Sequence, residues 1–142
     1  MNQSKQPIIV VEDDAEDREI LKEVLESLKL PFPVKYFDEG RAVLDYLRTT
    51  KDHPFIILTD VNMSGMNGIR LREEIMKDEA LRVKSIPFVF VSTSDGKDML
   101  HKIYDLQVQG YFEKPNTLSG MKTQLSLIIQ YWMECRHPNQ VK

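Results

Sequence analysis

Short apolar runs alternate with longer amphipathic stretches along the chain. The apolar runs are rich in β-branched and aromatic residues and are bounded by Gly, Pro or Asp, a pattern typical of short strands. We expect strands at residues 8–11, 34–37, 55–58, 87–92 and 110–112. The run at 55–58 is apolar throughout, which predicts a strand buried on both faces. The last run is short, which favours a strand at an edge of the sheet.

The stretches between these runs carry apolar residues at helical spacing. They predict helices at residues 14–28, from an N-cap at Asp38 through residue 47, from 69 to about 81, from 95 to 106, and from near Thr117 to 132. Strict alternation of strand and helix predicts one α/β domain, a doubly wound parallel sheet of five strands with five helices on its two faces. We place its core at about residues 7–134 of 1–142 and expect residues 137–142 to be frayed.

The composition narrows the class of protein. Of the 142 residues, 42% are hydrophobic and 29% are charged, which is typical of a soluble globular domain. The net charge of −3, with Lys and Arg spread along the chain, argues against direct binding of nucleic acid or of an anionic membrane. No apolar run approaches the roughly 20 residues that span a bilayer. The single Cys135 excludes an intrachain disulfide and fits a cytoplasmic protein.

Polar side chains follow the predicted strands at the points where they end. Because parallel strands all end at one edge of the sheet, these side chains are expected to lie close together. They are Glu12, Asp13 and Asp14 after the first strand, Thr59 and Asp60 after the third, Ser92, Thr93 and Ser94 after the fourth, and Glu113, Lys114 and Pro115 after the fifth. Asp60, which directly follows a buried strand, is therefore placed as a working residue rather than as a loop acid.

The chemistry of this set favours a phosphoryl group. Clustered carboxylates repel one another unless a cation or a proton intervenes, and hard oxygen ligands without a Cys–His pair favour Mg²⁺ or Mn²⁺ over zinc. A lysine and hydroxyl groups suit the oxygens of a phosphoryl group, and an aspartate can itself become phosphorylated. The residues therefore suggest metal-assisted transfer of a phosphoryl group onto a carboxylate.

From about Ile8 to Met133 the chain resembles the receiver domain of bacterial two-component response regulators. The resemblance lies in the run Ile8-Ile9-Val10-Val11-Glu12-Asp13-Asp14 and in the residues that end the later strands, in the family's order. It implies that Asp60 is the phosphoacceptor. It implies that Mg²⁺ (or Mn²⁺) is bound by Asp13, Asp60, the Asn62 carbonyl and, through water, Glu12. It also implies a switch hydroxyl at Ser92, a phosphate-pairing lysine at Lys114, a proline that often follows a cis bond at Pro115, and a switch aromatic at Tyr111. Thr93, Ser94 and Asn62 are implied to tune the reaction.

The same resemblance implies what the protein does. A phosphohistidine of a sensor histidine kinase or a phosphotransfer protein donates to Asp60, and the domain later hydrolyses its own aspartyl phosphate. Phosphorylation changes a surface formed by the fourth helix, fifth strand and fifth helix, which signals to a downstream protein, or the phosphoryl group is relayed onward. With no output domain expected after the last helix, the chain resembles a single-domain, chemotaxis-type regulator. The apolar last helix could also support a homodimer.

Two features depart from the minimal receiver pattern. Ser64 stands where the family usually has proline, and we expect it to loosen the loop without removing a catalytic group. The stretch at residues 77–85 is longer than usual. Together with Tyr131 and Trp132, it resembles the regulators that serve phytochrome-type and other hybrid histidine kinases.

Other classes fit the pattern less well. An aspartate-nucleophile phosphatase of the haloacid-dehalogenase type normally has a second acid two residues after the nucleophile, where this chain has Asn62. A pseudo-receiver, a binding module on the same fold, would not need the acids and Lys114. A flavodoxin-type cofactor site lacks its phosphate-cradling loop, because acids follow the first strand. The three scattered histidines, His53, His101 and His137, are expected at the surface.

Overall fold

The computed structural model describes residues 6–93 and 97–139, which form five strands and six helices. The strands are β1 (Ile8–Val11), β2 (Val34–Phe37), β3 (Ile56–Thr59), β4 (Phe88–Ser92) and β5 (Gly110–Glu113). They make one parallel sheet in the order β2-β1-β3-β4-β5. The predicted doubly wound parallel sheet is confirmed, and β5 is an edge strand as expected.

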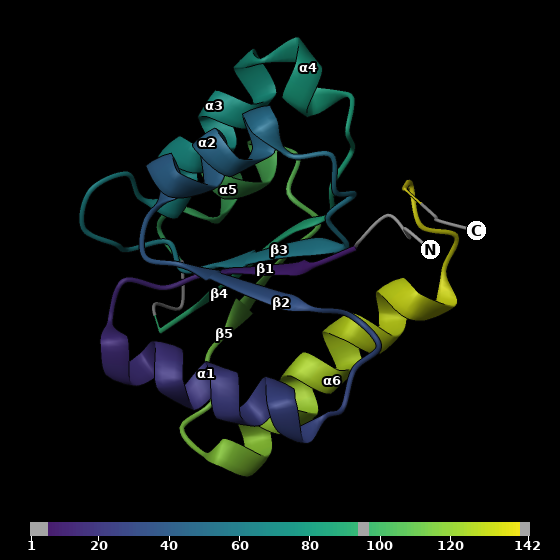
Figure 1. Cartoon of the computed structure of the whole chain (residues 1–142). Helices are drawn as coiled ribbons and strands as arrows, with labels where there is room; N and C mark the ends of the chain where they lie inside the picture. The colour runs from purple at the N-terminus through teal and green to yellow at the C-terminus, as the bar shows by residue number, and fades with distance from the viewer. Residues whose placement is uncertain (1–5, 94–96, 140–142) are drawn as a thin grey trace.

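The helices cover both faces of the sheet (Figure 1). They are α1 (Ala15–Ser27), α2 (Gly40–Thr49), α3 (Gly68–Lys77), α4 (Glu79–Arg82), α5 (Leu100–Asp105) and α6 (Leu118–Glu134). Helices α1 and α6 pack on one face, and α2 to α5 lie on the other. Across the described part of the chain, none of these helices combines the length and the apolar character that crossing a membrane requires.

The sheet divides the core into two layers because successive strand residues point to opposite faces. Ile57 and Phe88 pack with α2 and α3, whereas Leu58 and Val89 pack with α1 and α6. All residues of β1, β3 and β4 are buried, as expected for central parallel strands covered by helices on both sides. The sheet is therefore a rigid platform that fixes the positions of the residues following its strands.

The predicted third helix is interrupted, which gives six helices instead of five. Helix α3 ends at Lys77, and Asp78 serves both as its C-cap and as the N-cap of α4. The Asp78 carboxylate accepts hydrogen bonds from the backbone N–H groups of Ala80 and Leu81, and thereby starts a new helical turn. The long segment at residues 77–85 thus contains a helix of its own, whose Leu81 side chain is buried in the core.

Other predicted boundaries shift by small amounts. The N-cap of α2 is Glu39 and not Asp38, because the Glu39 carboxylate accepts the hydrogen bond from the Arg41 N–H. Strand β3 begins and ends one residue later than predicted. Helix α5 begins at Leu100, later than the predicted residue 95, and part of that prediction lies outside the described residues. Thr117 caps α6 as expected.

The prediction that residues 137–142 are frayed and His137 exposed is wrong for the described part of this segment. His137 is 9% exposed, and its ring stacks on Phe55 with centroids 4.9 Å apart. Its Nε2–H donates to the Phe55 carbonyl at 2.6 Å, and its Nδ1 accepts from the Asn139 N–H at 2.9 Å. The Asn139 side chain in turn donates to the Lys84 carbonyl. The chain after α6 is therefore folded against the start of β3.

These contacts make the stability of the fold depend on the neutral form of His137. Burial lowers the pKa of His137, and the hydrogen bond to Phe55 opposes this effect only in part. A proton on Nδ1 would also point at the Asn139 N–H, which now donates a hydrogen bond to this nitrogen. Because the folded-state pKa lies below the unfolded value near 6.5, the stabilisation is complete above that value and is lost as the pH falls through the window down to the folded pKa.

We therefore expect the wild-type protein to lose more free energy of unfolding between about pH 7.5 and about pH 5.5 than the His137→Asn variant does. Urea denaturation at the two pH values measures both losses. The variant is less stable at both pH values, but only the difference between its two values tests the titration. Equal losses in the two proteins would show that His137 does not titrate differently in the folded state.

Candidate functional site

The residues that follow the strands converge at one edge of the sheet, as predicted. Asp60, directly after β3, accepts a hydrogen bond on Oδ1 from the Ser92 hydroxyl at 2.9 Å. Lys114, directly after β5, lies with its Nζ 3.7 Å from Asp60 Oδ2 and 2.7 Å from Glu12 Oε1. Residues from β1, β3, β4 and β5 thus meet around one carboxylate.

The backbone around Asp60 fixes the direction of its side chain. Its own N–H donates to the Val11 carbonyl at 3.4 Å, which continues the pairing of β3 with β1. The Asn62 N–H donates to Oδ1 at 3.1 Å, so this oxygen accepts two hydrogen bonds. Asp60 is 9% exposed and therefore sits in a shallow, largely desolvated position.

Gly68, the first residue of α3, allows this helix to approach the site. A Cβ at this position would lie 2.2 Å from the Asp60 carbonyl oxygen and 2.7 Å from the Phe90 ring. No side chain fits in that space, so only glycine lets α3 start directly beneath the loop that follows β3. Gly68 is thus part of the architecture of the site.

Glu12 and Lys114 form a buried ion pair. Their side chains are 3% and 7% exposed. Burial raises the pKa of Glu12, against the effect of the neighbouring ammonium group. Burial would lower the pKa of Lys114, but the hydrogen bond and charge of Glu12, together with the charge of Asp60, outweigh it and raise that pKa. Lys114 is therefore a cation held between two carboxylates.

Asp13 is held by the loop that follows β3. Its Oδ2 accepts hydrogen bonds from the Ser64 N–H at 2.9 Å and from the Ser64 hydroxyl at 3.1 Å. The backbone hydrogen bond from Ser64 is the main reason that the pKa of Asp13 is lowered. The expectation that Ser64 loosens this loop is wrong, because Ser64 ties the loop to the end of β1.

The predicted metal ligands are brought to one edge, but their carboxylates are occupied by protein groups. Glu12 faces Lys114, and Asp13 faces Ser64. Within residues 6–93 and 97–139, no three side chains of His, Cys, Asp or Glu are grouped so as to hold a metal ion. The donor chemistry still fits a hard divalent cation, since three carboxylates and the exposed Asn62 segment supply only oxygen ligands.

The predicted switch residues differ in their exposure, and of these only Ser92 has a hydrogen bond to Asp60 among the described contacts. Ser92 is fully buried, and Thr93 next to it is exposed. Tyr111 is half-buried, with its ring centroid 6.1 Å from that of Phe90. The bond before Pro115 is trans, which differs from the cis form that the resemblance implied. The predicted tuning residue Ser94 lies outside the described residues.

Two contributors to the site were missed by the sequence reasoning. Arg18 of α1 donates from Nη1 to the Glu12 carbonyl at 2.8 Å and so holds the backbone of the acidic segment. Ser64, treated as a mere departure from the family pattern, is the partner of Asp13. The contact of Ser64 spans 51 positions of the chain, and no local pattern signals it. Arg18 lies one helical turn into α1, shortly after the acids Glu12, Asp13 and Asp14. A basic residue so close to three acids was the signal in the sequence that could have identified it.

Comparison with known proteins agrees with this architecture. The family model of the response regulator receiver domain matches residues 8–126. Chemotaxis protein CheY-3 of Vibrio cholerae is 31% identical over 123 residues, which are 87% of this chain and 91% of that protein. The phosphorylated cyanobacterial phytochrome response regulator RcpA has a similar structure, with a TM-score of 0.83 and 29% identity over 96% of this chain and 100% of that one.

A second similar structure was solved with a bound metal ion. The Mn²⁺-bound form of response regulator Rcp1 matches with a TM-score of 0.78 and 26% identity, covering 92% of this chain and 96% of that one. The family match covers both ends of the sheet and includes every strand that contributes to the site around Asp60. This chain therefore belongs to the response regulator receiver domain family.

Proposed function

We propose that this protein accepts a phosphoryl group on Asp60 from the phosphohistidine of a sensor histidine kinase or of a phosphotransfer protein. The observation that carries the proposal is the asymmetry of the Asp60 carboxylate. Oδ1 accepts hydrogen bonds from Ser92 and Asn62, whereas Oδ2 faces the Lys114 ammonium at 3.7 Å. Oδ2 is therefore the oxygen with lone pairs left for attack. The similar protein RcpA has been solved in a phosphorylated form.

The transfer replaces one bond by another. Asp60 Oδ2 forms a bond to phosphorus as the bond from phosphorus to the donor imidazole nitrogen breaks, and that nitrogen retains the electron pair. Lys114 stabilises the negative oxygens of the phosphoryl group, and the Ser92 hydroxyl can donate to one of them. The position of Asp60, fixed by its backbone contacts, presents the carboxylate in one direction. Hydrolysis by water later restores the free carboxylate.

A divalent cation, Mg²⁺ or Mn²⁺, is part of this proposal. Asp13, Asp60 and the Asn62 carbonyl would hold it directly, and Glu12 would act through water. When bound, the cation neutralises charge on the phosphoryl oxygens. Its binding has to compete with the hydrogen bonds that Asp13 accepts from Ser64. Ser64 is thus a residue of this chain that sets how easily Asp13 becomes a ligand.

Replacing Ser64 by proline is expected to tighten Mg²⁺ binding about fivefold. Proline has neither the N–H nor the hydroxyl that now holds Asp13. The substitution therefore removes ~1 kcal/mol of interaction that competes with the metal. Isothermal titration calorimetry measures the affinity. The Ser64→Thr variant keeps both donors and should bind as the wild type does. Weaker binding by the proline variant would mean that Ser64 instead holds Asp13 in the position that the metal needs.

The output of phosphorylation is proposed to be a change of surface rather than a chemical product. Movement of the Ser92 hydroxyl towards the phosphoryl group would open space next to Tyr111, whose ring lies beside Phe90 on the neighbouring strand. The Tyr111 N–H also donates to the Tyr104 hydroxyl at 3.2 Å, which links β5 to α5. The surface of α5, β5 and α6 is therefore the one that a downstream protein would recognise.

The proposal is tested by incubating the full chain with Mg²⁺ and acetyl phosphate and reading its intact mass over time. We expect a gain of one phosphoryl group in the wild type and in Asp45→Asn, which removes an exposed acid of α2. We expect none in Asp60→Asn or in a sample with EDTA. An equal gain in Asp60→Asn would overturn the assignment. Turnover of acetyl phosphate without any adduct would favour a phosphatase, and no reaction even with a kinase would favour a pseudo-receiver.

A further inference from the structure

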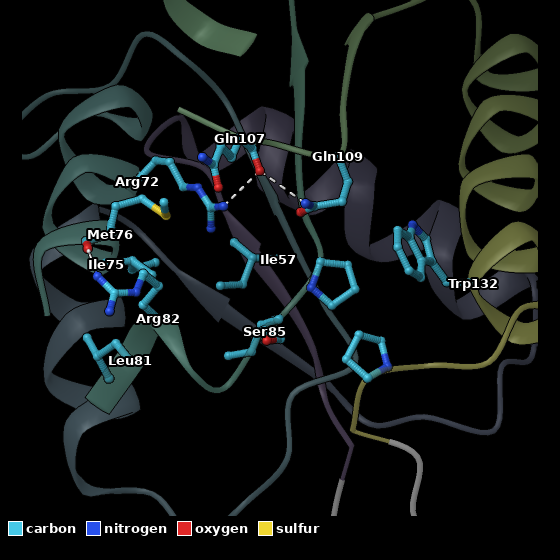
Figure 2. Close-up of a pocket in the computed structure, with 13 residues that line it drawn as sticks. Ile57, Arg72, Ile75, Met76, Leu81, Arg82, Ser85, Gln107, Gln109 and Trp132 are labelled. Atoms are coloured by element: carbon cyan, nitrogen blue, oxygen red, sulfur yellow. Dashed lines mark hydrogen bonds between the residues drawn. The ribbon is translucent and has the colours of Figure 1, made fainter. Parts of the chain in front are cut away.

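A pocket lies at the opposite end of the sheet from Asp60. Figure 2 shows the residues that line it. Its volume is about 350 Å³, which is in the range of small-molecule sites, roughly 300–1,000 Å³. Ile57, near the start of β3, lines it, whereas Asp60 follows the end of the same strand. Residues of α3, α4 and α6 and the segments before β4 and β5 form the walls. The pocket is therefore separate from the site described above.

A buried guanidinium group lines this pocket. Arg72 of α3 is only 7% exposed. It donates from Nε to the Leu106 carbonyl at 2.9 Å and from Nη2 to the Gln107 carbonyl at 2.8 Å, and so caps the end of α5. These bonds use two of its five N–H donors. No carboxylate among the described residues forms an ion pair with Arg72, and burial lowers its pKa.

A second arginine lies on the same side of the pocket. Figure 2 shows the guanidinium groups of Arg72 and Arg82 on one side of Ile57, with Trp132 on the other. Arg82 is exposed and makes one long contact, at 3.4 Å from Nη1 to the Met76 carbonyl. None of the residues that line the pocket is acidic. Two positively charged side chains therefore line a pocket without an acidic residue, and the buried one, Arg72, also lies over the Phe88 ring, 5.3 Å from its centroid.

The rest of the lining is apolar or uncharged. In Figure 2, Ile57 lies between the two arginines and Trp132, and Pro87 and Pro138 also line the pocket. Pro138 belongs to the segment after α6 that His137 fastens to β3, so this wall is held in place by hydrogen bonds. An occupant would therefore meet a cationic wall and an apolar wall at the same time.

We propose that this pocket binds a small organic carboxylate with an apolar body. The carboxylate would lie against Arg72 and Arg82, where guanidinium groups offer donors in the geometry that carboxylates prefer. The apolar body would lie against Ile57 and Trp132. The buried Arg72 guanidinium has no carboxylate partner among the described residues, and the ligand would supply one. The hydrogen bonds of Arg72 to the end of α5 explain why it is buried. They do not explain why a pocket lies next to it or why Arg82 lines the same pocket.

Trp132 is the single tryptophan of the chain, so its fluorescence reports on this pocket directly. The experiment titrates the full chain with cyclohexanecarboxylate, a probe that does not absorb where tryptophan is excited. We expect a saturable change with a Kd of about 1 mM. The neutral cyclohexanecarboxamide and inorganic phosphate are titrated beside it, and neither should produce a saturable change.

Two charge-matched variants locate the effect. Arg82→Gln removes an exposed pocket arginine and is expected to weaken binding about tenfold. Lys84→Gln removes a charge two positions further on, outside the pocket lining, and should bind within about twofold of the wild type. The proposal is overturned by the absence of saturable binding in the wild type or by unchanged affinity in Arg82→Gln. Equal binding of the carboxamide would also overturn it, because the arginines would then contribute nothing. Equal binding of phosphate would overturn it as well, because the apolar residues would then contribute nothing.

Discussion

Replacing Lys114 by methionine is expected to slow phosphorylation of Asp60 roughly 100- to 1,000-fold and to destabilise the fold by about 3 kcal/mol. The rate falls because the Lys114 ammonium group, 3.7 Å from Asp60 Oδ2, is placed to stabilise the negative oxygens of the incoming phosphoryl group. The stability falls because Glu12, 3% exposed, is left buried without its counter-charge. Acetyl phosphate kinetics and urea denaturation measure the two effects.

The two effects can be separated by a second substitution. Glu12→Gln in the methionine background removes the uncompensated charge, so we expect it to restore most of the lost stability. It cannot restore the missing ammonium group, and it also removes the acid proposed to act on the divalent cation through water, so phosphorylation should remain slow. Lys114→Arg keeps the charge and should lose less stability than methionine does. Recovery of the phosphorylation rate together with stability would show that Lys114 acts through folding and not on the phosphoryl group.

Replacing Gly68 by alanine is expected to lower the free energy of unfolding by about 3 kcal/mol, the upper end of the usual cost of overpacking. The new Cβ would meet the Asp60 carbonyl oxygen at 2.2 Å, and this neighbour is backbone that cannot turn aside. Either α3 or the loop after β3 has to move. Because Asp60 belongs to that loop, we also expect slower phosphorylation, by about tenfold.

A matched glycine in the same loop provides the control. Gly65 has a φ of 69°, and a Cβ at this position would be in ordinary van der Waals contact with the Glu39 side chain, 3.4 Å from its nearest atom. Asparagine tolerates this backbone conformation, so Gly65→Asn should cost about 1 kcal/mol or less. If Gly68→Ala were as mild as this control, the close approach of α3 to Asp60 would not be a constraint on the fold.

Much of the sheet was predictable because its signals are local. The β-branched run at β1 and the apolar run at β3 allow few other structures, and acids, hydroxyls and a lysine at strand ends must meet once the strands are parallel. The place of Asp60 beside Ser92 and Lys114 follows from that rule. The resemblance to a known family added the roles of these residues, which spacing alone does not supply.

Two of the errors have the same physical cause, which is contact between residues that lie far apart in sequence. His137 looks like a polar residue in a terminal segment, but Phe55 provides both a stacking ring and a carbonyl. The role of Ser64 depends on Asp13, which the fold brings to it from another strand. The break at Asp78 depends on which of several polar residues serves as the N-cap, and the cap propensities of these residues differ little.

The central claim is that Asp60 itself carries the phosphoryl group, and chemical trapping tests it most directly. Borohydride reduces an acyl phosphate to an alcohol, so it would convert a phosphorylated Asp60 into homoserine, which peptide mass mapping identifies by position. We expect homoserine at position 60 only after treatment with both Mg²⁺ and acetyl phosphate. Homoserine at Asp13 or at another aspartate, in a protein that has gained a phosphoryl group, would contradict the account.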